Sequence, residues 1–145
     1  MRCPFPLVVM AALSAPAAAA TIPSLETTTP TICVANSKDA DRESRPTQAQ
    51  IGALEKSLIS YFAALRAERA NLPAPGLRYA RQYSGVVRDG KKLIYGRFYP
   101  STEPAPSFAK AGDCWVASDG GSRYWDVYFD PKSGRVVGHR VNGVA

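Results

Sequence analysis

The sequence has 145 residues, with 18 lysines and arginines against 12 aspartates and glutamates, a formal net charge of +6 and 46% hydrophobic residues. This length suits one domain with a single core and leaves too little chain for two domains of ordinary size. The basic and acidic residues are interspersed, so the positive excess suits ordinary solubility as well as attraction to an anionic surface.

The first twenty residues predict a secretory signal peptide, residues 1–20. Arg2 is followed by a short apolar run and then by three alanines at 18–20. A charged start, a short hydrophobic stretch and small residues at the cleavage site are the parts of such a signal. The apolar run is too short to span a bilayer, and the sequence contains no second one. We therefore expect no transmembrane segment and a mature chain that begins near Thr21, in the periplasm or outside the cell.

Two cysteines, Cys33 and Cys114, remain once the signal is removed. In an oxidising compartment an even pair is most simply a disulfide. Closing a loop of about eighty residues stabilises a fold by roughly 4 to 5 kcal/mol in the chain-entropy model. The sequence has no CxxC and a single histidine, so the usual spacing of metal or reactive-thiol sites is missing. We expect a structural disulfide, no cofactor and no metal.

Residues 21–46 contain few large apolar residues, which is typical of an extended, poorly ordered leader. The pattern changes at Thr47, which forms a capping-box signature with Gln50. The apolar residues that then recur every three or four positions are Ile51, Leu54, Leu58, Phe62 and Leu65. This spacing predicts one long amphipathic helix over residues 47–70, ended by the prolines and glycine of 71–76.

After this breaker the apolar residues alternate, which is typical of strands. Residues 79–88 and 91–99 flank Asp89 and Gly90, a strong hairpin signal because both central positions of a type I′ turn need positive φ. The face of this hairpin that we assign to the core consists of Tyr79, Tyr83, Val87, Ile94 and Phe98.

A second hairpin is predicted from a short strand at 114–117 and a longer one at 123–130. In the longer strand the residues expected to point inward are Trp125, Val127 and Phe129. The Pro- and Gly-containing turn at 131–134 returns the chain into a last strand, 135–141. The layout is an α+β domain over residues 47–145, with one long N-terminal helix packed on a four-stranded antiparallel meander sheet.

This order of elements resembles the cystatin-like fold, and the related nuclear-transport-factor-2-like cone is close to it. Residues 127–137 are also similar to the closing hairpin of PepSY domains, small exported modules linked to protease inhibition. Cystatins inhibit papain-like proteases through a QxVxG hairpin loop and a later Pro-Trp loop. Here the stretch from Gln82 to Gly85 lacks the valine, and Trp115 follows Cys114, so the inhibitory motif is not carried over. The resemblance implies a fold that hosts enzymes, inhibitors and binding modules alike.

Any acid–base chemistry that uses imidazole must involve His139, the single histidine. If residues 131–134 form a four-residue loop, Asp126 lies opposite His139 on the outward face, beside Tyr124 and Tyr128. Such a pair could orient an imidazole to accept a proton, and it could equally be a cross-strand surface pair. No nucleophile motif such as GxSxG accompanies it.

Basic residues gather along the first hairpin among tyrosines, a combination that could bind an anionic ligand. The candidate binding residues are Arg81, Arg88, Lys91, Lys92 and Arg97. The alternative is that lysines on an exposed strand edge prevent edge-to-edge pairing. The export signal argues against nucleic acid, so the expected partner is an envelope protein or an anionic surface.

These features favour an exported, non-catalytic binding or interaction module. The alternative is a small-pocket ligand carrier or enzyme of the nuclear-transport-factor-2-like kind, in which Asp126 and His139 act. Large residues such as Phe62 and Trp125 could line such a pocket or fill it, and filling is favoured at this chain length. A carrier or enzyme needs a cavity with polar groups converging inside it, whereas a module needs only an exposed patch or edge.

Overall fold

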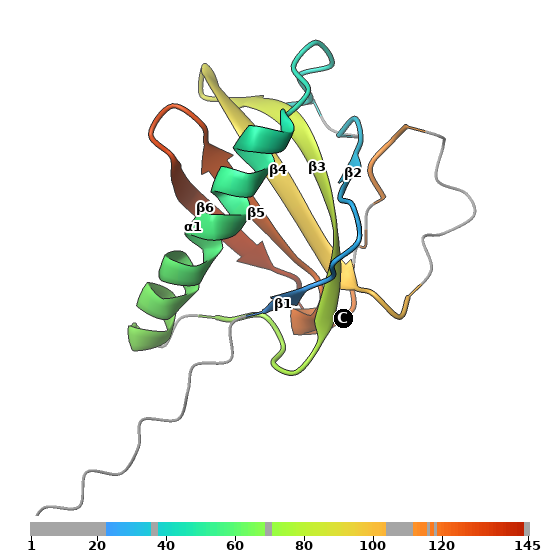
Figure 1. The fold of residues 1–145 in the computed structure, drawn as a ribbon, viewed down its shortest axis with the longest axis vertical. Helices are drawn as coiled ribbons and strands as arrows, with labels where there is room; N and C mark the ends of the chain where they lie inside the picture. Colours follow the sequence, from blue (N-terminus) through green and yellow to red (C-terminus); the bar gives the residue numbers. More distant parts are fainter. Residues whose placement is uncertain are drawn as a thin grey trace, which may run out of the picture.

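The described residues form one α-helix and a curled, mixed sheet of six strands, and the helix lies across one face of the sheet (Figure 1). The computed structural model describes residues 23–35, 38–68, 71–103, 112–115, 117 and 119–143. The expected signal peptide, residues 1–20, lies outside them. Within these ranges, no helix is both long enough and apolar enough to cross a membrane. The α+β class predicted from the sequence is confirmed.

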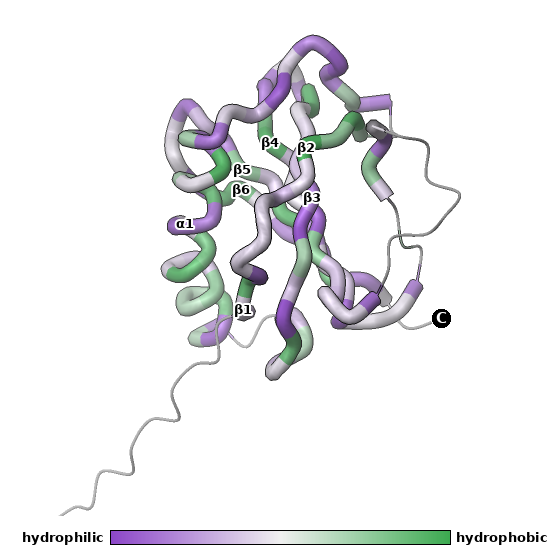
Figure 2. Tube along the Cα trace, turned by 45° about the vertical axis from the view of Figure 1, so that its right-hand side comes forward, coloured by the Kyte–Doolittle hydropathy of each residue, from purple (hydrophilic) through white to green (hydrophobic). Residues whose placement is uncertain are grey.

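Helix α1 (Gln48–Ala67) begins where the sequence predicts it. The Thr47 hydroxyl accepts a hydrogen bond from the Gln50 backbone N–H (3.2 Å), and the Gln50 side chain accepts one from the Thr47 N–H (2.9 Å). The buried residues of the helix belong to the predicted apolar stripe: Ile51, Leu54, Leu58 and Phe62. Figure 2 shows the resulting alternation of hydrophobic and hydrophilic segments along α1. The stripe fixes which face of α1 packs on the sheet.

Strands β3 (Arg78–Arg88) and β4 (Lys91–Pro100) form the predicted first hairpin. Asp89 and Gly90 make its turn with φ values of 50° and 72°, the positive values that a type I′ turn requires. A two-residue turn leaves no freedom in the register, so the cross-strand partners along the hairpin are those expected from the sequence.

The far half of the sheet consists of β5 (Trp125–Asp130) and β6 (Arg135–Val141), preceded by one turn of 3-10 helix, η1 (Gly121–Arg123). Strand β5 pairs with β4 on one side and with β6 on the other, both antiparallel. The second hairpin predicted between residues 114–117 and 123–130 is therefore wrong, because both edges of β5 are already paired.

Two short strands from the leader segment 21–46 complete the sheet. Strands β1 (Ser24–Leu25) and β2 (Thr31–Ile32) pair in parallel with β3. Further along, the Asp41 N–H donates to the Gly85 carbonyl (3.0 Å), so the leader covers much of the outer edge of β3. The prediction of four antiparallel strands is corrected to a mixed sheet of six. A strand of two residues is too short to show alternating apolar residues in the sequence, so the sequence did not indicate β1 and β2. These strands form because the backbone groups on the outer edge of β3 need hydrogen-bond partners.

The main core lies between α1 and the sheet. The strand residues buried in it are Tyr79, Tyr83, Ile94, Phe98, Trp125, Val127 and Phe129. Trp125 stacks on Phe98 with ring centroids 3.7 Å apart and meets Phe62 edge-on at 5.1 Å. These residues confirm the predicted inward faces of β3, β4 and β5, except at Val87. That side chain is 39% exposed, because it lies near the hairpin turn at the end of β3.

Candidate functional site

The two candidate acid–base residues do not form a pair. Asp126 lies opposite Arg140, and His139 lies opposite Val127. The turn itself is as predicted, since the Gly134 N–H donates to the Asp130 carbonyl (2.9 Å). A β-bulge beside Tyr128 and Phe129 then leaves Val137 without a cross-strand partner, which shifts the rest of β6 by one position. A shift of one residue moves a side chain to the other face of a sheet, so the predicted pairing is wrong.

His139 lies on the face of the sheet that α1 covers. Its Nδ1 lies 2.9 Å from the Tyr61 hydroxyl, and its Nε2 lies 3.1 Å from the Asn71 carbonyl oxygen. A carbonyl can only accept, so Nε2 carries the proton and Nδ1 accepts from the tyrosine in the neutral tautomer. Burial, together with the charge of Glu68, raises the pKa of Tyr61, which keeps that hydroxyl protonated. Both ring nitrogens are therefore engaged in contacts that fix α1 and the following segment to β6.

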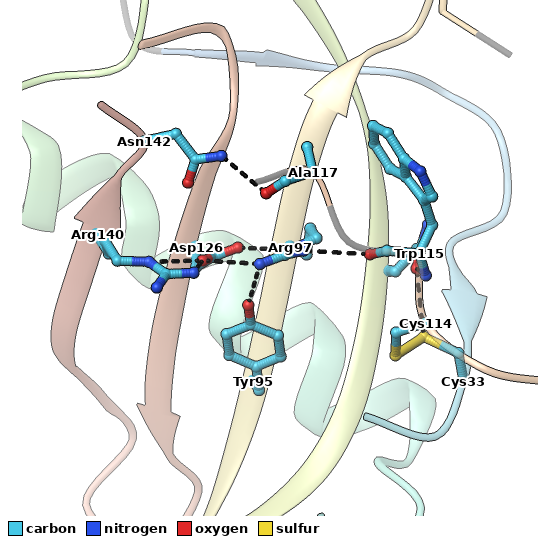
Figure 3. A network of polar contacts seen from close by, with 10 residues as sticks. Cys33, Tyr95, Arg97, Cys114, Trp115, Ala117, Asp126, Arg140 and Asn142 are labelled. Atoms are coloured by element: carbon cyan, nitrogen blue, oxygen red, sulfur yellow. Dashed lines mark hydrogen bonds and ion pairs between the residues drawn. A yellow bond between two sulfur atoms is a disulfide. The ribbon is translucent and has the colours of Figure 1, made fainter. Parts of the chain in front are cut away.

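Asp126 lies on the opposite face, in an ion cluster with the buried Arg97 and the largely exposed Arg140 (Figure 3). The Arg97 Nε donates to Oδ1 of Asp126 at 2.7 Å, and the Arg140 Nη2 donates to Oδ2 at 2.8 Å. Arg97 also donates to the Tyr95 hydroxyl at 2.6 Å and to the Trp115 carbonyl at 3.3 Å. The Asp126 side chain is 2% exposed, so this carboxylate is enclosed by its two guanidinium partners.

The ion cluster has the properties of a structural contact. Burial opposes the charge on Arg97, but the hydrogen bonds and charge of Asp126 outweigh it and raise the pKa of Arg97. Burial, followed by the charge of Asp126, also raises the pKa of Tyr95. At neutral pH both groups therefore hold their protons, and Asp126 has each of its oxygens in a charge-assisted hydrogen bond. Sequence reasoning missed Arg140 because the bulge that places it beside Asp126 has no marker in the sequence.

The predicted disulfide between Cys33 and Cys114 is confirmed, with an S–S distance of 2.08 Å and a sequence separation of 81. It joins the leader to the segment that covers the ion cluster. In that segment the Trp115 N–H donates to the Gln82 side chain (2.7 Å), and the Trp115 ring packs edge-on against Tyr99, with ring centroids 5.1 Å apart. The disulfide thus holds a cover over the face of the sheet that α1 does not reach.

The predicted basic residues do not form one surface. Arg81 is buried on the α1 side, where it pairs with Glu55, whereas Arg97 is buried in the ion cluster on the other side. Lys92 is exposed and lies 3.6 Å from a carboxylate oxygen of Asp41. The other two line a hollow of about 240 Å³ near the hairpin turn, where the Arg88 guanidinium lies 4.4 Å from the centre of the Tyr128 ring and Lys91 is exposed. Anion binding by these residues stays a prediction.

An apolar groove of about 390 Å³ runs between α1 and β1. Its lining consists of Pro23, Ser24, Leu25, Glu55, Leu58, Ile59, Phe62 and Trp125. A second hollow of about 250 Å³ adjoins it, since Pro23 and Phe62 line both. Ile59, 54% exposed, forms part of the wall. We call the first hollow the α1–β1 groove. The one feature of the sequence that could have indicated it is Ile59, an isoleucine outside the apolar stripe of the helix.

Trp125 belongs to the core and also lines the α1–β1 groove. Its side chain is almost fully buried, and its Nε1–H has no hydrogen-bond partner among the described residues. The Tyr79 hydroxyl beside it donates its own proton to the Ala74 carbonyl (2.9 Å). Burial raises the pKa of Tyr79, and an interaction with the Trp125 side chain partly offsets that rise. Trp125 thus contributes to an apolar wall of the groove, while its Nε1 atom is buried beside Tyr79.

Neither Asp126 nor His139 lines the α1–β1 groove or the hollow that adjoins it. Among the described residues, no group of three or more His, Cys, Asp or Glu side chains is arranged to hold a metal ion. The chemistry that this site offers is burial of apolar groups. Comparisons of the chain with family models, curated proteins and solved structures found no match.

Proposed function

We propose that this protein is an exported, non-catalytic binding module of cystatin-like type, and that its docking site is the α1–β1 groove. The observation that carries the proposal is the groove's lining of five large apolar side chains, Leu25, Leu58, Ile59, Phe62 and Trp125. Its volume, about 390 Å³, falls within the range of roughly 300 to 1,000 Å³ that small ligand sites occupy.

Export is supported by two features of different kinds. The residues at 1–20 have the composition of a signal peptide, and a disulfide joins Cys33 to Cys114. Disulfides of this sort persist in oxidising compartments and are rare where thiols are kept reduced. The place of action that we propose is therefore the periplasm or the medium, with an envelope protein as the partner.

The positions of the acid–base candidates favour a module over an enzyme. A general base must reach a substrate proton from within a site that also holds the reacting group. Asp126 is enclosed by two arginines, while His139 contacts Tyr61 and Asn71 on the other face of the sheet. A carrier or enzyme of the nuclear-transport-factor-2-like kind would need these groups to converge in one cavity, and they point to opposite sides.

Exposed apolar surface supports the choice of this groove as the docking site. Ile59 is one of the few large hydrophobic side chains exposed among the described residues, and it belongs to the groove wall. Contiguous apolar surface with a polar surround is typical of interaction sites, since water contacts it unfavourably.

The test is binding to envelope proteins by the exported full chain, purified under non-reducing conditions. We expect one stoichiometric partner that persists at high salt and is lost in I59E, which puts a charge into the groove wall. Ala53→Glu adds the same charge to an exposed position of α1 outside the groove and should leave binding intact. His139→Gln should also bind normally.

Two outcomes would overturn the proposal. Partner binding that is unaffected by Ile59→Glu but is lost at high salt and in Arg88→Gln would move the site to the hollow near the hairpin turn, which Arg88 and Lys91 line. Loss of binding in His139→Gln with retention in I59E would favour a site built around the imidazole, as the carrier or enzyme alternative requires.

A further inference from the structure

We infer that the hollow which adjoins the α1–β1 groove, and which Arg66 lines, receives the C-terminal residue of the partner protein, with its free carboxylate at Arg66. The residues before it lie in the α1–β1 groove. This inference rests on the proposed function and specifies which part of the partner docks. We call this second site the Arg66 hollow. Its charge, its apolar walls and its continuity with the groove support the inference.

The charge of the Arg66 hollow favours an anionic group. Arg66 is exposed, and the described lining contains no aspartate or glutamate. A second cation lies nearby: burial raises the pKa of Tyr79, the positive charge of Arg123 partly offsets that rise, and the Tyr79 hydroxyl contacts Ala74 of the lining. Glu68 acts instead on Tyr61, which contacts β6. A carboxylate in the hollow is therefore favoured by two positive charges.

The walls of the Arg66 hollow favour the end of a chain over an acidic side chain. Apart from Arg66 and Ser122 the lining is apolar or small, and it includes Phe62 and Leu72. A C-terminal residue brings a carboxylate and an apolar side chain to the same point, whereas aspartate or glutamate brings the charge in place of the apolar group. Capture of a C-terminal carboxylate is a recurring mode of peptide recognition, and a guanidinium matches a carboxylate with two parallel hydrogen bonds.

The Arg66 hollow continues into the α1–β1 groove, because Pro23 and Phe62 line both. Ile59, in the groove wall, and Arg66 are seven residues apart on α1, which is about 10 Å along the helix axis. Three residues of extended chain cover about the same distance. Figures 1 and 2 both show β1 beside α1, and Leu25 of β1 lines the opposite wall. About four residues at the end of the partner therefore contact the site.

The open wall of the groove favours a peptide over a fatty acid, which also ends in a carboxylate. Ile59 is 54% exposed, so the groove encloses an occupant on one side only. An acyl chain is apolar all round and would keep part of its surface in water. An extended peptide presents alternate side chains to opposite sides, so it can bury apolar groups and turn polar groups outward.

The experiment is a titration of N-terminally dye-labelled hexapeptides with the exported full chain, followed by fluorescence anisotropy. The peptides have leucine, valine or phenylalanine at the last and third-last positions, and each is made as the free acid and as the C-terminal amide. We expect a subset of the free acids to saturate. Their amides should bind roughly tenfold more weakly, the effect of losing one hydrogen bond between charged groups.

Substitutions locate the carboxylate. Arg66→Gln should remove the difference between acid and amide, and Arg66→Lys should retain most of it, because lysine keeps the charge. Arg42→Gln removes a positive charge from an exposed position that lines neither hollow and should change nothing. Ile59→Glu should abolish binding of both forms.

Arg66 also lies in the last turn of α1, where its charge opposes the partial negative charge of the last carbonyls. If that were its whole role, R66Q would leave the difference between acid and amide intact, which would overturn the inference.

The remaining outcomes each contradict the inference in a recognisable way. Equal affinity of acids and amides would refute the carboxylate contact. Amidated peptides that end in aspartate or glutamate and bind as well as the free acids would place an acidic side chain at Arg66. Binding of sodium decanoate but of no peptide would make the two hollows an acyl-chain site. No peptide binding, combined with an envelope partner whose binding I59E still abolishes, would refute C-terminal docking and leave the proposed function standing.

Discussion

The two faces of the sheet are covered by different means. On one face, α1 packs over an apolar core in which Phe98 and Trp125 stack with ring centroids 3.7 Å apart. On the other, Arg97 and Asp126 form an ion pair beneath the segment that contains Trp115, which the Cys33–Cys114 disulfide fastens to the leader. A few apolar residues, Ala35, Val86 and Leu93, form a small second core there.

This difference shows how a small sheet can be covered without a second helix. Burial of an amphipathic helix is stabilising over its whole apolar stripe, so no single contact decides the outcome. An ion pair is stable in a buried position only when every charge has its partner. The face opposite α1 therefore depends on a covalent bond and on a few polar contacts, and it should be the more sensitive of the two to single substitutions.

The largest effect should follow removal of the disulfide. Replacing both Cys33 and Cys114 with serine should lower the free energy of unfolding by about 4 to 5 kcal/mol, because the bond closes a loop of 81 residues. Urea denaturation of the two proteins measures the difference. A loss below about 1 kcal/mol would mean that the cover stays in place through its hydrogen bonds alone.

Substitution of Asp126 should come next. Asp126→Asn leaves the buried guanidinium of Arg97 without its counter-charge and should cost about 3 to 5 kcal/mol. Arg140→Gln removes the partner that is 63% exposed and should cost less than about 1 kcal/mol. Both values come from urea denaturation, and similar costs for the two variants would contradict the view that Arg97 is the essential partner.

On the α1 side, the close approach of the leader can be tested at Gly85. A Cβ at this position would lie 2.1 Å from the Ser44 carbonyl oxygen, so Gly85→Ala should cost about 1 to 3 kcal/mol. Gly52→Ala is the control, because a Cβ there meets nothing within 4 Å and a helix gains about 0.5 to 1 kcal/mol from the exchange. Thermal unfolding should separate the two in opposite directions; equal midpoints would place the leader away from β3.

The last effect, absent at neutral pH, appears only in alkali and compares one tyrosine from each face. Burial raises the pKa of Tyr83, on the α1 side, and of Tyr95, beside the ion cluster, above the ordinary value of 10.0. Above about pH 10 each tyrosine loses its proton in the unfolded chain but keeps it in the folded one, so stability is constant below that pH and falls above it by about 1.4 kcal/mol per pH unit for each group.

Tyr83→Phe and Tyr95→Phe should each make this alkaline decline less steep. The measurement is the free energy of unfolding in urea between pH 8 and roughly pH 12, where tyrosines titrate. A slope that only one of the variants reduces would show that the other tyrosine is accessible to hydroxide in the folded protein, and hence that its face of the sheet opens more readily.

The elements that the sequence predicts well are those determined by neighbouring residues. The capping box at Thr47 and the helical spacing after it define α1, and Asp89 with Gly90 defines the hairpin and its register. Each of these signals lies within a few residues of the structure that it specifies. The disulfide was also predictable, because Cys33 and Cys114 are the two cysteines that remain after the expected signal peptide.

The features that escaped prediction depend on distant residues. Strands β1 and β2 have two residues each, and their partners in β3 lie about fifty residues further along the chain, so no local pattern marks them. The bulge at Val137 is invisible for another reason, since valine is as suitable for a regular strand as for a bulge. Because of this one-residue bulge, Asp126 lies opposite Arg140, and His139 lies on the other face of the sheet.

The candidate site, too, was predictable only where it depends on neighbouring residues. Trp125 could be recognised as a core or pocket residue from its place in an alternating strand, but the groove exists because Leu25 docks beside α1. The second wall therefore comes from a segment whose composition is typical of an extended leader.

The disulfide also determines how the molecule would bear tension. A pull on the two ends of the chain passes through the covalent bond between Cys33 and Cys114, so the backbone between these residues, which includes α1, β3 and β4, cannot be drawn out while the bond is intact. The load falls on the strands outside the loop: β1 and β2 at one end, and β5 and β6 at the other. A protein anchored or pulled at its termini would thus lengthen only by the segments outside this loop.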